Sequence, residues 1–173
     1  MIALLAAKKR PDLFNRLMLL GPSPCYIDQG DYVGGFTREG IDELLTFLEI
    51  NQAGWSTNLA PMVMSNADRP ELAAELEAFF CRNDPAIMHH FAGVLFLSDH
   101  REDLEGIAIS TLIMQFADDI VAPPEVGDFM HKALVNSALV VLDTHGHYPQ
   151  MSHPEHVRRA VVDYLRTPAR LAA

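Results

Sequence analysis

The sequence predicts an α/β fold in which helices flank a parallel sheet of about three strands. Unbroken apolar runs predict the strands, because a strand covered by helices on both faces lacks the polar alternation of a half-buried strand. These runs are residues 17–20, 111–116 and 138–142. Helical segments separate and follow them, and strands that alternate with helices build a parallel sheet.

The helices of this sheet are expected at residues 1–10, 124–134 and 154–165. The second and third begin with proline, which fits the first turn of a helix because its missing N–H would have no partner there. The first is stopped by Pro11 and has no Ser, Thr, Asp or Asn ahead of it to cap its free N–H groups. We therefore expect this helix to begin upstream of Met1.

Between the first two predicted strands lies an insertion, residues 23–109, that is too long for an ordinary crossover. Its periodic segments predict four helices, at residues 38–49, 51–64, 70–81 and 84–97. We interpret them as a helical cap inserted over the sheet. The expected domains are a partial core, residues 1–22 and 110–173, and a cap that returns to the core, residues 23–109.

Composition excludes several classes of function. The chain has 173 residues, of which 49% are hydrophobic, and a net charge of −10, which disfavours binding to nucleic acid. The apolar first residues are too short to span a membrane. The cysteines, Cys25 and Cys81, show no metal-binding spacing and are expected to stay reduced. We expect a cytoplasmic protein.

Two short polar segments follow the second and third predicted strands. Asp119 lies in Gln-Phe-Ala-Asp-Asp-Ile-Val-Ala-Pro, and His147 lies in Gly-His-Tyr-Pro-Gln-Met-Ser-His-Pro. The carboxyl ends of parallel strands meet at one edge of a sheet, where catalytic groups gather. An acid and an imidazole there are two members of a Ser-His-Asp triad.

The acid could also be Asp118. We choose Asp119 because the later residue reaches further over the sheet edge, and we expect Asp118 to point to solvent or to cap the turn. The alternative is that both aspartates only cap a loop.

Histidines near the chain end invite a second interpretation, as a metal site. His145, His147, His153 and His156 lie close in sequence, but no carboxylate ligand set or fixed scaffold accompanies them. We expect no metal and no cofactor. His89 and His90, on an apolar helix, are expected to be a packed or rim pair.

The segments 11–26, 32–36, 96–104, 115–123 and 146–154 closely resemble the RsbQ-like α/β hydrolases, bacterial activators of a stress response. They resemble the plant strigolactone and karrikin receptors more distantly. The resemblance implies an α/β-hydrolase core, a four-helix cap over a hydrophobic pocket, and a triad with Asp119 as acid and His147 as base. It also implies that the serine and the oxyanion donors lie upstream of Met1, so this chain alone is expected to be inactive.

Apolar residues of the insertion are candidates for the pocket. We expect substrate contacts from Trp55, Met88, Phe91 and Phe96, and from Ile120 beside the acid; Trp55 and Phe96 match pocket positions in the resembled family. The alternative is that such residues only pack the cap. A mostly apolar cavity suits a small hydrophobic ester or lactone.

Three functional hypotheses follow. The leading one is a serine hydrolase of the RsbQ type, for which this chain supplies the cap, the acid and the base. The second is a receptor with slow or no turnover, which captures a small hydrophobic molecule and contacts a regulatory phosphatase or another signalling protein. The third is a truncated reading frame with no independent role.

Overall fold

A computed structural model describes residues 1–167 of the chain. Its sheet has three parallel strands in the order β1-β2-β3: β1 spans Arg16–Leu20, β2 Ser110–Asp118 and β3 Ser137–His145. The predicted α/β class, a parallel sheet of three strands with flanking helices, is confirmed. Each strand contains its predicted run. At their carboxyl ends β2 and β3 extend two and three residues further than predicted, so β2 runs into the segment of Asp119 and β3 ends directly before the segment of His147.

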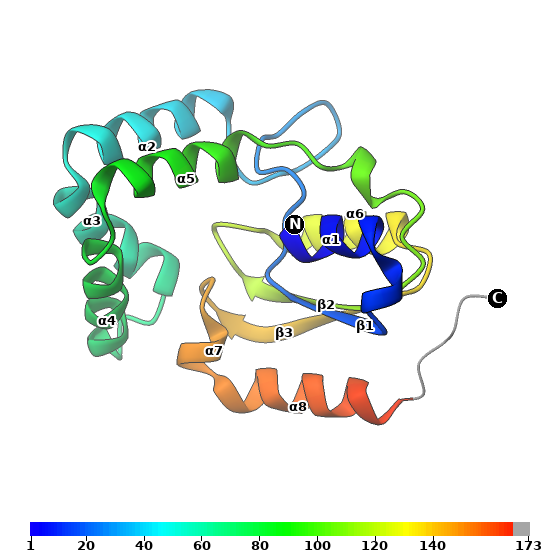
Figure 1. Ribbon diagram of the computed structural model, residues 1–173. Helices are drawn as coiled ribbons and strands as arrows, with labels where there is room; N and C mark the ends of the chain where they lie inside the picture. Colours follow the sequence, from blue (N-terminus) through cyan, green and yellow to red (C-terminus); the bar gives the residue numbers. More distant parts are fainter. Residues whose placement is uncertain (168–173) are drawn as a thin grey trace.

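Helices cover both faces of the sheet (Figure 1). On one face lie α1, Ile2–Lys9, and α6, Pro124–Ala133; on the other lies α8, Pro154–Arg166. Leu4 and Val126 pack with Ile113 of β2 on the first face, and Val161 packs near Phe116 on the second. The apolar spacing of these helices therefore builds two layers of core around β2.

The expectation that every strand is buried on both faces is correct only for β2. Six consecutive residues of β2 are buried, whereas Met18 of β1 is 42% exposed and Val141 of β3 is 49% exposed. The reason is position: β2 is the central strand, and the helices cover the outer strands only in part.

The insertion forms four helices on one side of the sheet (Figure 1). They are α2, Arg38–Ile50; α3, Gln52–Met64; α4, Pro70–Cys81; and α5, Pro85–Leu97. Side chains of Thr37, Asn51 and Asp84 accept hydrogen bonds from the free N–H groups that open α2, α3 and α5. The four helices share an apolar cluster that also includes Tyr26, and Val121, Tyr148 and Met151 pack against it. The division into core and cap stays a prediction.

Three short helices complete the described chain: η1, Pro11–Leu13, η2, Glu102–Leu104, and α7, Pro149–Ser152. No helix was expected at α7, which begins two residues after His147. Cys25 is buried and Cys81 exposed, and neither forms a disulfide. Among residues 1–167 no helix has the length and hydrophobicity that crossing a membrane requires.

Candidate active site

The structure brings Asp119 and His147 into contact. His147 Nδ1 lies 2.8 Å from Asp119 Oδ2, although the two residues are 28 positions apart in the chain. The Asp119 side chain is fully buried, and that of His147 is 20% exposed. A buried carboxylate requires such a partner, because burial of an unpaired charge costs several kcal/mol.

The second carboxylate oxygen is also satisfied. Asp119 Oδ1 accepts a hydrogen bond of 2.9 Å from the backbone N–H of Val121, which fixes the turn after β2. The carboxylate is therefore held on one side by its own loop and presents its other oxygen to the imidazole.

Gly146 allows the close loop geometry that positions the His147 imidazole. Gly146 has φ +77° and donates its N–H to Asp118 O, at 2.7 Å. A Cβ at Gly146 would lie 2.1 Å from Met64 O, so a larger residue does not fit. The next N–H, of His147, donates to Val63 O at 2.7 Å. The loop thus crosses the end of α3 at backbone distance.

The imidazole ring packs against residues from several elements. A Cβ at Gly21, at the end of β1, would lie 3.0 Å from His147 Cε1, and the rings of Phe116 and Tyr148 make edge contacts with it. With Nδ1 held by Asp119, Nε2 is the nitrogen left to accept a proton. A carboxylate at Nδ1 favours the tautomer that carries its proton on that nitrogen, and Nε2 then has a free lone pair.

Asp118 has a different environment. It contacts His145, with 3.3 Å between His145 Nδ1 and Asp118 Oδ2, and both side chains are more than half exposed. The structure thus separates the adjacent aspartates: one is buried against His147, and the other lies at the surface as expected.

The remaining histidines do not assemble a metal site. Among residues 1–167, no three His, Cys, Asp or Glu side chains gather closely enough to hold a metal ion. His153 and His156 make an edge contact, with ring centroids 5.7 Å apart. Burial and then the positive charge of Arg69 lower the pKa of His153. His89 is half-buried and His90 exposed.

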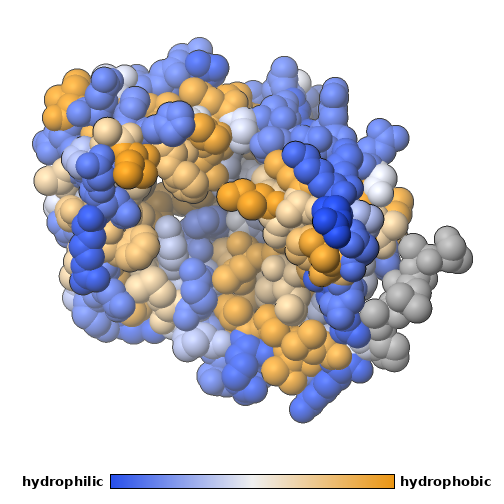
Figure 2. Space-filling model, viewed as in Figure 1, coloured by the Kyte–Doolittle hydropathy of each residue, from blue (hydrophilic) through white to orange (hydrophobic). Residues whose placement is uncertain are grey.

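A cavity of about 520 Å³ opens beside His147. Apolar surface gathers around this hollow between the helical insertion and the sheet (Figure 2). All five residues expected to contact substrate line it, namely Trp55, Met88, Phe91, Phe96 and Ile120. Their contact with a substrate stays a prediction. Ile120 and Phe91 are 44% and 55% exposed, so they stand at the open side, whereas Trp55 and Phe96 are buried.

Two tyrosines line the same cavity and were missed by the sequence analysis. Burial, followed by the nearby charge of Asp119, raises the pKa of Tyr26 to about 12. The same two causes raise the pKa of Tyr148. Tyr148 could have been suspected from its place after His147. Tyr26 contacts Phe96 edge-on, with ring centroids 5.2 Å apart. No local sequence pattern predicts this contact.

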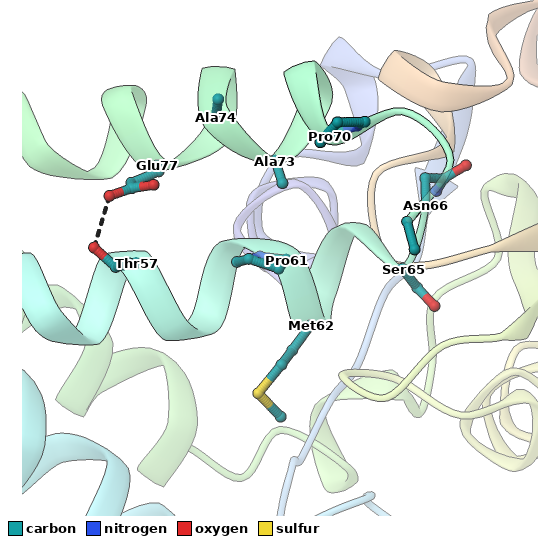
Figure 3. Close-up of a pocket in the computed structure, with 10 residues that line it drawn as sticks. Thr57, Pro61, Met62, Ser65, Asn66, Pro70, Ala73, Ala74 and Glu77 are labelled. Carbon is teal, nitrogen blue, oxygen red and sulfur yellow. Dashed lines mark hydrogen bonds between the residues drawn. The ribbon is translucent and has the colours of Figure 1, made fainter.

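A second hollow, of about 550 Å³, lies between α3 and α4 (Figure 3). Thr57 and Glu77 close it with a hydrogen bond of 2.6 Å, and Met62 borders both hollows. His147 lines the first cavity but not this second hollow. The cavity beside His147 is therefore the candidate active site.

Comparison with known proteins finds similar sequences and structures. Residues 98–172 match the Abhydrolase_4 family model, described as TAP-like protein. The chain is 32% identical over 159 residues to "Strigolactone esterase RMS3" of Pisum sativum, covering 91% of this chain and 59% of the relative. It is 32% identical over 156 residues to "Karrikin insensitive 2 receptor CA" of Petunia hybrida, covering 90% and 58%.

A solved structure of a hydrolase from Oleispira antarctica superposes with a TM-score of 0.92 at 35% identity, over 96% of this chain and 62% of that one. The chain thus spans about 60% of the length of the proteins it matches. The three-stranded parallel sheet with its flanking helices is thus a partial α/β-hydrolase fold, and the chain is similar in sequence to the esterase and the receptor named above.

Proposed function

We propose that this chain supplies the acid, the base and the ligand cavity of a serine hydrolase of the RsbQ type, which cleaves a small hydrophobic ester or lactone. One observation carries the proposal: a buried Asp119 carboxylate holds Nδ1 of His147 at 2.8 Å, and His147 lines an apolar cavity.

In the proposed reaction, His147 Nε2 takes the proton of a serine hydroxyl while the serine oxygen bonds to the carbonyl carbon of the substrate. The ester C–O bond then breaks, and the protonated His147 returns the proton to the departing alcohol oxygen. Water hydrolyses the acyl-serine by the same route. Asp119 keeps its hydrogen bond to Nδ1 throughout and stabilises the imidazolium that forms.

The sequence contains no Gly-x-Ser-x-Gly turn, which carries the nucleophile in hydrolases of this fold. We propose that the serine and the oxyanion donors belong to the part of the fold that these 173 residues do not include. Under this proposal residues 1–173 bind ligand but do not transfer acyl groups, and the insertion acts as a cap over the core.

The lining of the cavity supports the proposed substrate class. Its lining residues are mainly aliphatic and aromatic, and the few with polar groups are Asn83, His147, Tyr26, Tyr148 and Trp55. Such a cavity favours a compact apolar molecule with one polar, cleavable group, and it disfavours a charged substrate.

The test uses the native gene product. A fluorophosphonate probe should label one serine, and short-chain aryl esters and lactones should be hydrolysed. His147→Ala should abolish both reactions, whereas His145→Ala, which changes an exposed histidine two residues away, should retain them. Equal activity in the two variants would refute the assigned base.

A receptor is the second candidate, because a relative named as a receptor matches 90% of this chain. In this case the cavity captures the same class of small molecule, and the cap presents a surface to a regulatory phosphatase or another signalling protein in the cytoplasm. A saturable, ligand-dependent rise in melting temperature without product release would favour the receptor. Multiple turnovers would favour the hydrolase.

A further inference from the structure

The turn between α3 and α4, residues 65–69, contacts the loop that carries His147 on both sides of the histidine. Asn66 contacts the segment before His147, and Arg69 contacts the segment after it. We call the side chains of Asn66 and Arg69 the clamp. Figure 3 shows Asn66 in this turn, beyond the end of α3.

Arg69 makes two hydrogen bonds. Its Nη1 donates to Ser152 O at 2.6 Å, and its Nη2 donates to Asn66 Oδ1 at 2.5 Å. The planar guanidinium suits two acceptors at a fixed angle, which the single ammonium group of lysine cannot match. The side chain is 34% exposed, so the bonds are partly shielded from water.

The hydrogen bond from Arg69 to Ser152 O satisfies a free carbonyl group at the C-terminal end of α7. Ser152 is the last residue of this four-residue helix, and its carbonyl stands among the orphan acceptors of a helix end. The backbone N–H groups that follow do not donate to it: Pro154 has none, that of Glu155 makes no hydrogen bond to Ser152 O, and those of His156 and Val157 donate to His153 O. Arg69 is therefore the partner that closes α7.

Asn66 joins the clamp to the other side of the loop. It is buried, and its Nδ2 donates to Met64 O at 2.5 Å and, over a longer 3.4 Å, to His145 O. Between these contacts, His147 N–H donates to Val63 O. The end of α3 and the following turn thus hold the loop before, at and after the histidine.

We propose that Arg69, acting with Asn66, is a positioning residue: the clamp keeps His147 in register with Asp119 and couples it to α3. The inference deepens the proposed function and rests on it. α3 also forms one wall of the candidate active site, through Trp55 and Met62. A shift of this wall is therefore transmitted to the base through backbone contacts.

The first test is kinetic and uses the native gene product. Arg69→Ala should lower kcat by roughly tenfold or more, as expected for loss of a charge-assisted hydrogen bond that orients the base, with KM nearly unchanged. The rate is normalised to the serine labelled at the end point by a fluorophosphonate, so unfolded molecules do not count. Guanidinium ion should restore part of kcat, and Arg69→Lys should fall between wild type and Arg69→Ala.

The matched control is Arg38→Ala. Arg38 lies on α2 and pairs with the exposed Asp42 at 3.1 Å, so this variant removes an arginine of the insertion without touching the loop. It should retain the wild-type kcat and show no response to guanidinium. Equal kcat values for Arg69→Ala and Arg38→Ala would overturn the proposal.

The second test needs no activity. Hydrogen exchange at the His147 N–H should be about tenfold faster in Arg69→Ala than in Arg38→Ala, because the clamp secures the backbone to which it is bonded. Equal exchange would refute the clamp, and Arg69→Lys supplies the same comparison if Arg69→Ala fails to fold. If the wild-type native protein hydrolyses no ester or lactone, the proposed function fails, while the exchange data still decide whether the clamp holds the loop.

Discussion

Substitution of Gly146 by alanine should be one of the most destabilising single changes in the chain. Two costs add. Gly146 has φ +77°, a conformation that costs a residue with a Cβ about 1–2 kcal/mol. The new Cβ would also lie 2.1 Å from Met64 O, a distance that forces the loop away from α3. The neighbouring bond from His147 N–H to Val63 O then breaks, which leaves buried polar groups unpaired at about 1–3 kcal/mol.

Gly106→Ala separates the two costs. Gly106 has φ +80°, but no atom lies within 4 Å of its Cβ position, so this variant carries only the conformational cost. Changes in the unfolded state are shared by the two variants and cancel in the comparison. Urea unfolding should show a loss of about 2–5 kcal/mol for Gly146→Ala and about 1–2 kcal/mol for Gly106→Ala, with the Gly146→Ala loss larger by the cost of the broken crossing, about 1–3 kcal/mol. Equal losses within about 0.5 kcal/mol would refute the close crossing of α3 by the loop.

Two further predictions concern the cavity wall. Phe96→Ala removes a buried ring in edge contact with Tyr26 and Phe36, and urea unfolding should show that the free energy of unfolding falls by about 3–5 kcal/mol. Phe91→Ala changes an exposed position of the same helix and should lower the free energy of unfolding far less. Burial raises the pKa of Tyr26 to about 12, so the unfolded chain loses this proton first as the pH rises from about 10 to 12. The free energy of unfolding should therefore fall across that window, by about 2–3 kcal/mol from Tyr26, and Tyr26→Phe should flatten the fall; an unchanged slope would contradict the shift.

The strand runs and helix breakers predicted the layers of the fold because they act locally. Proline and capping side chains set the helix bounds, as Asp84 does for α5 by accepting from two backbone N–H groups. The burial of β1 and β3 could not be predicted in the same way, because it depends on which helices reach the outer strands. An apolar run such as that around Val141 has the same sequence pattern in a strand covered on both faces and in an outer strand covered only in part.

In the candidate site, too, the features set by local sequence were predictable and those set by long-range packing were not. Chain order and strand ends were enough to propose that Asp119 and His147 meet. The backbone crossing that fixes His147 could not be predicted, since carbonyl groups of Val63 and Met64 carry no residue-specific signal. Tyr26 reaches the cavity from a loop, and its contact with Phe96 spans 70 positions of the chain. Long-range packing of this kind leaves no periodic trace in the sequence.

The pairing of Asp119 with His147 is tested most directly by proton NMR of residues 1–173 with ¹⁵N-labelled histidine. The account predicts a downfield, slowly exchanging proton on Nδ1 of His147, bound to the buried carboxylate. This resonance should disappear in Asp119→Ala and persist in Asp118→Ala, which removes the exposed neighbour. A His147 Nδ1 proton that is absent from the wild type, or that survives Asp119→Ala, would contradict the account.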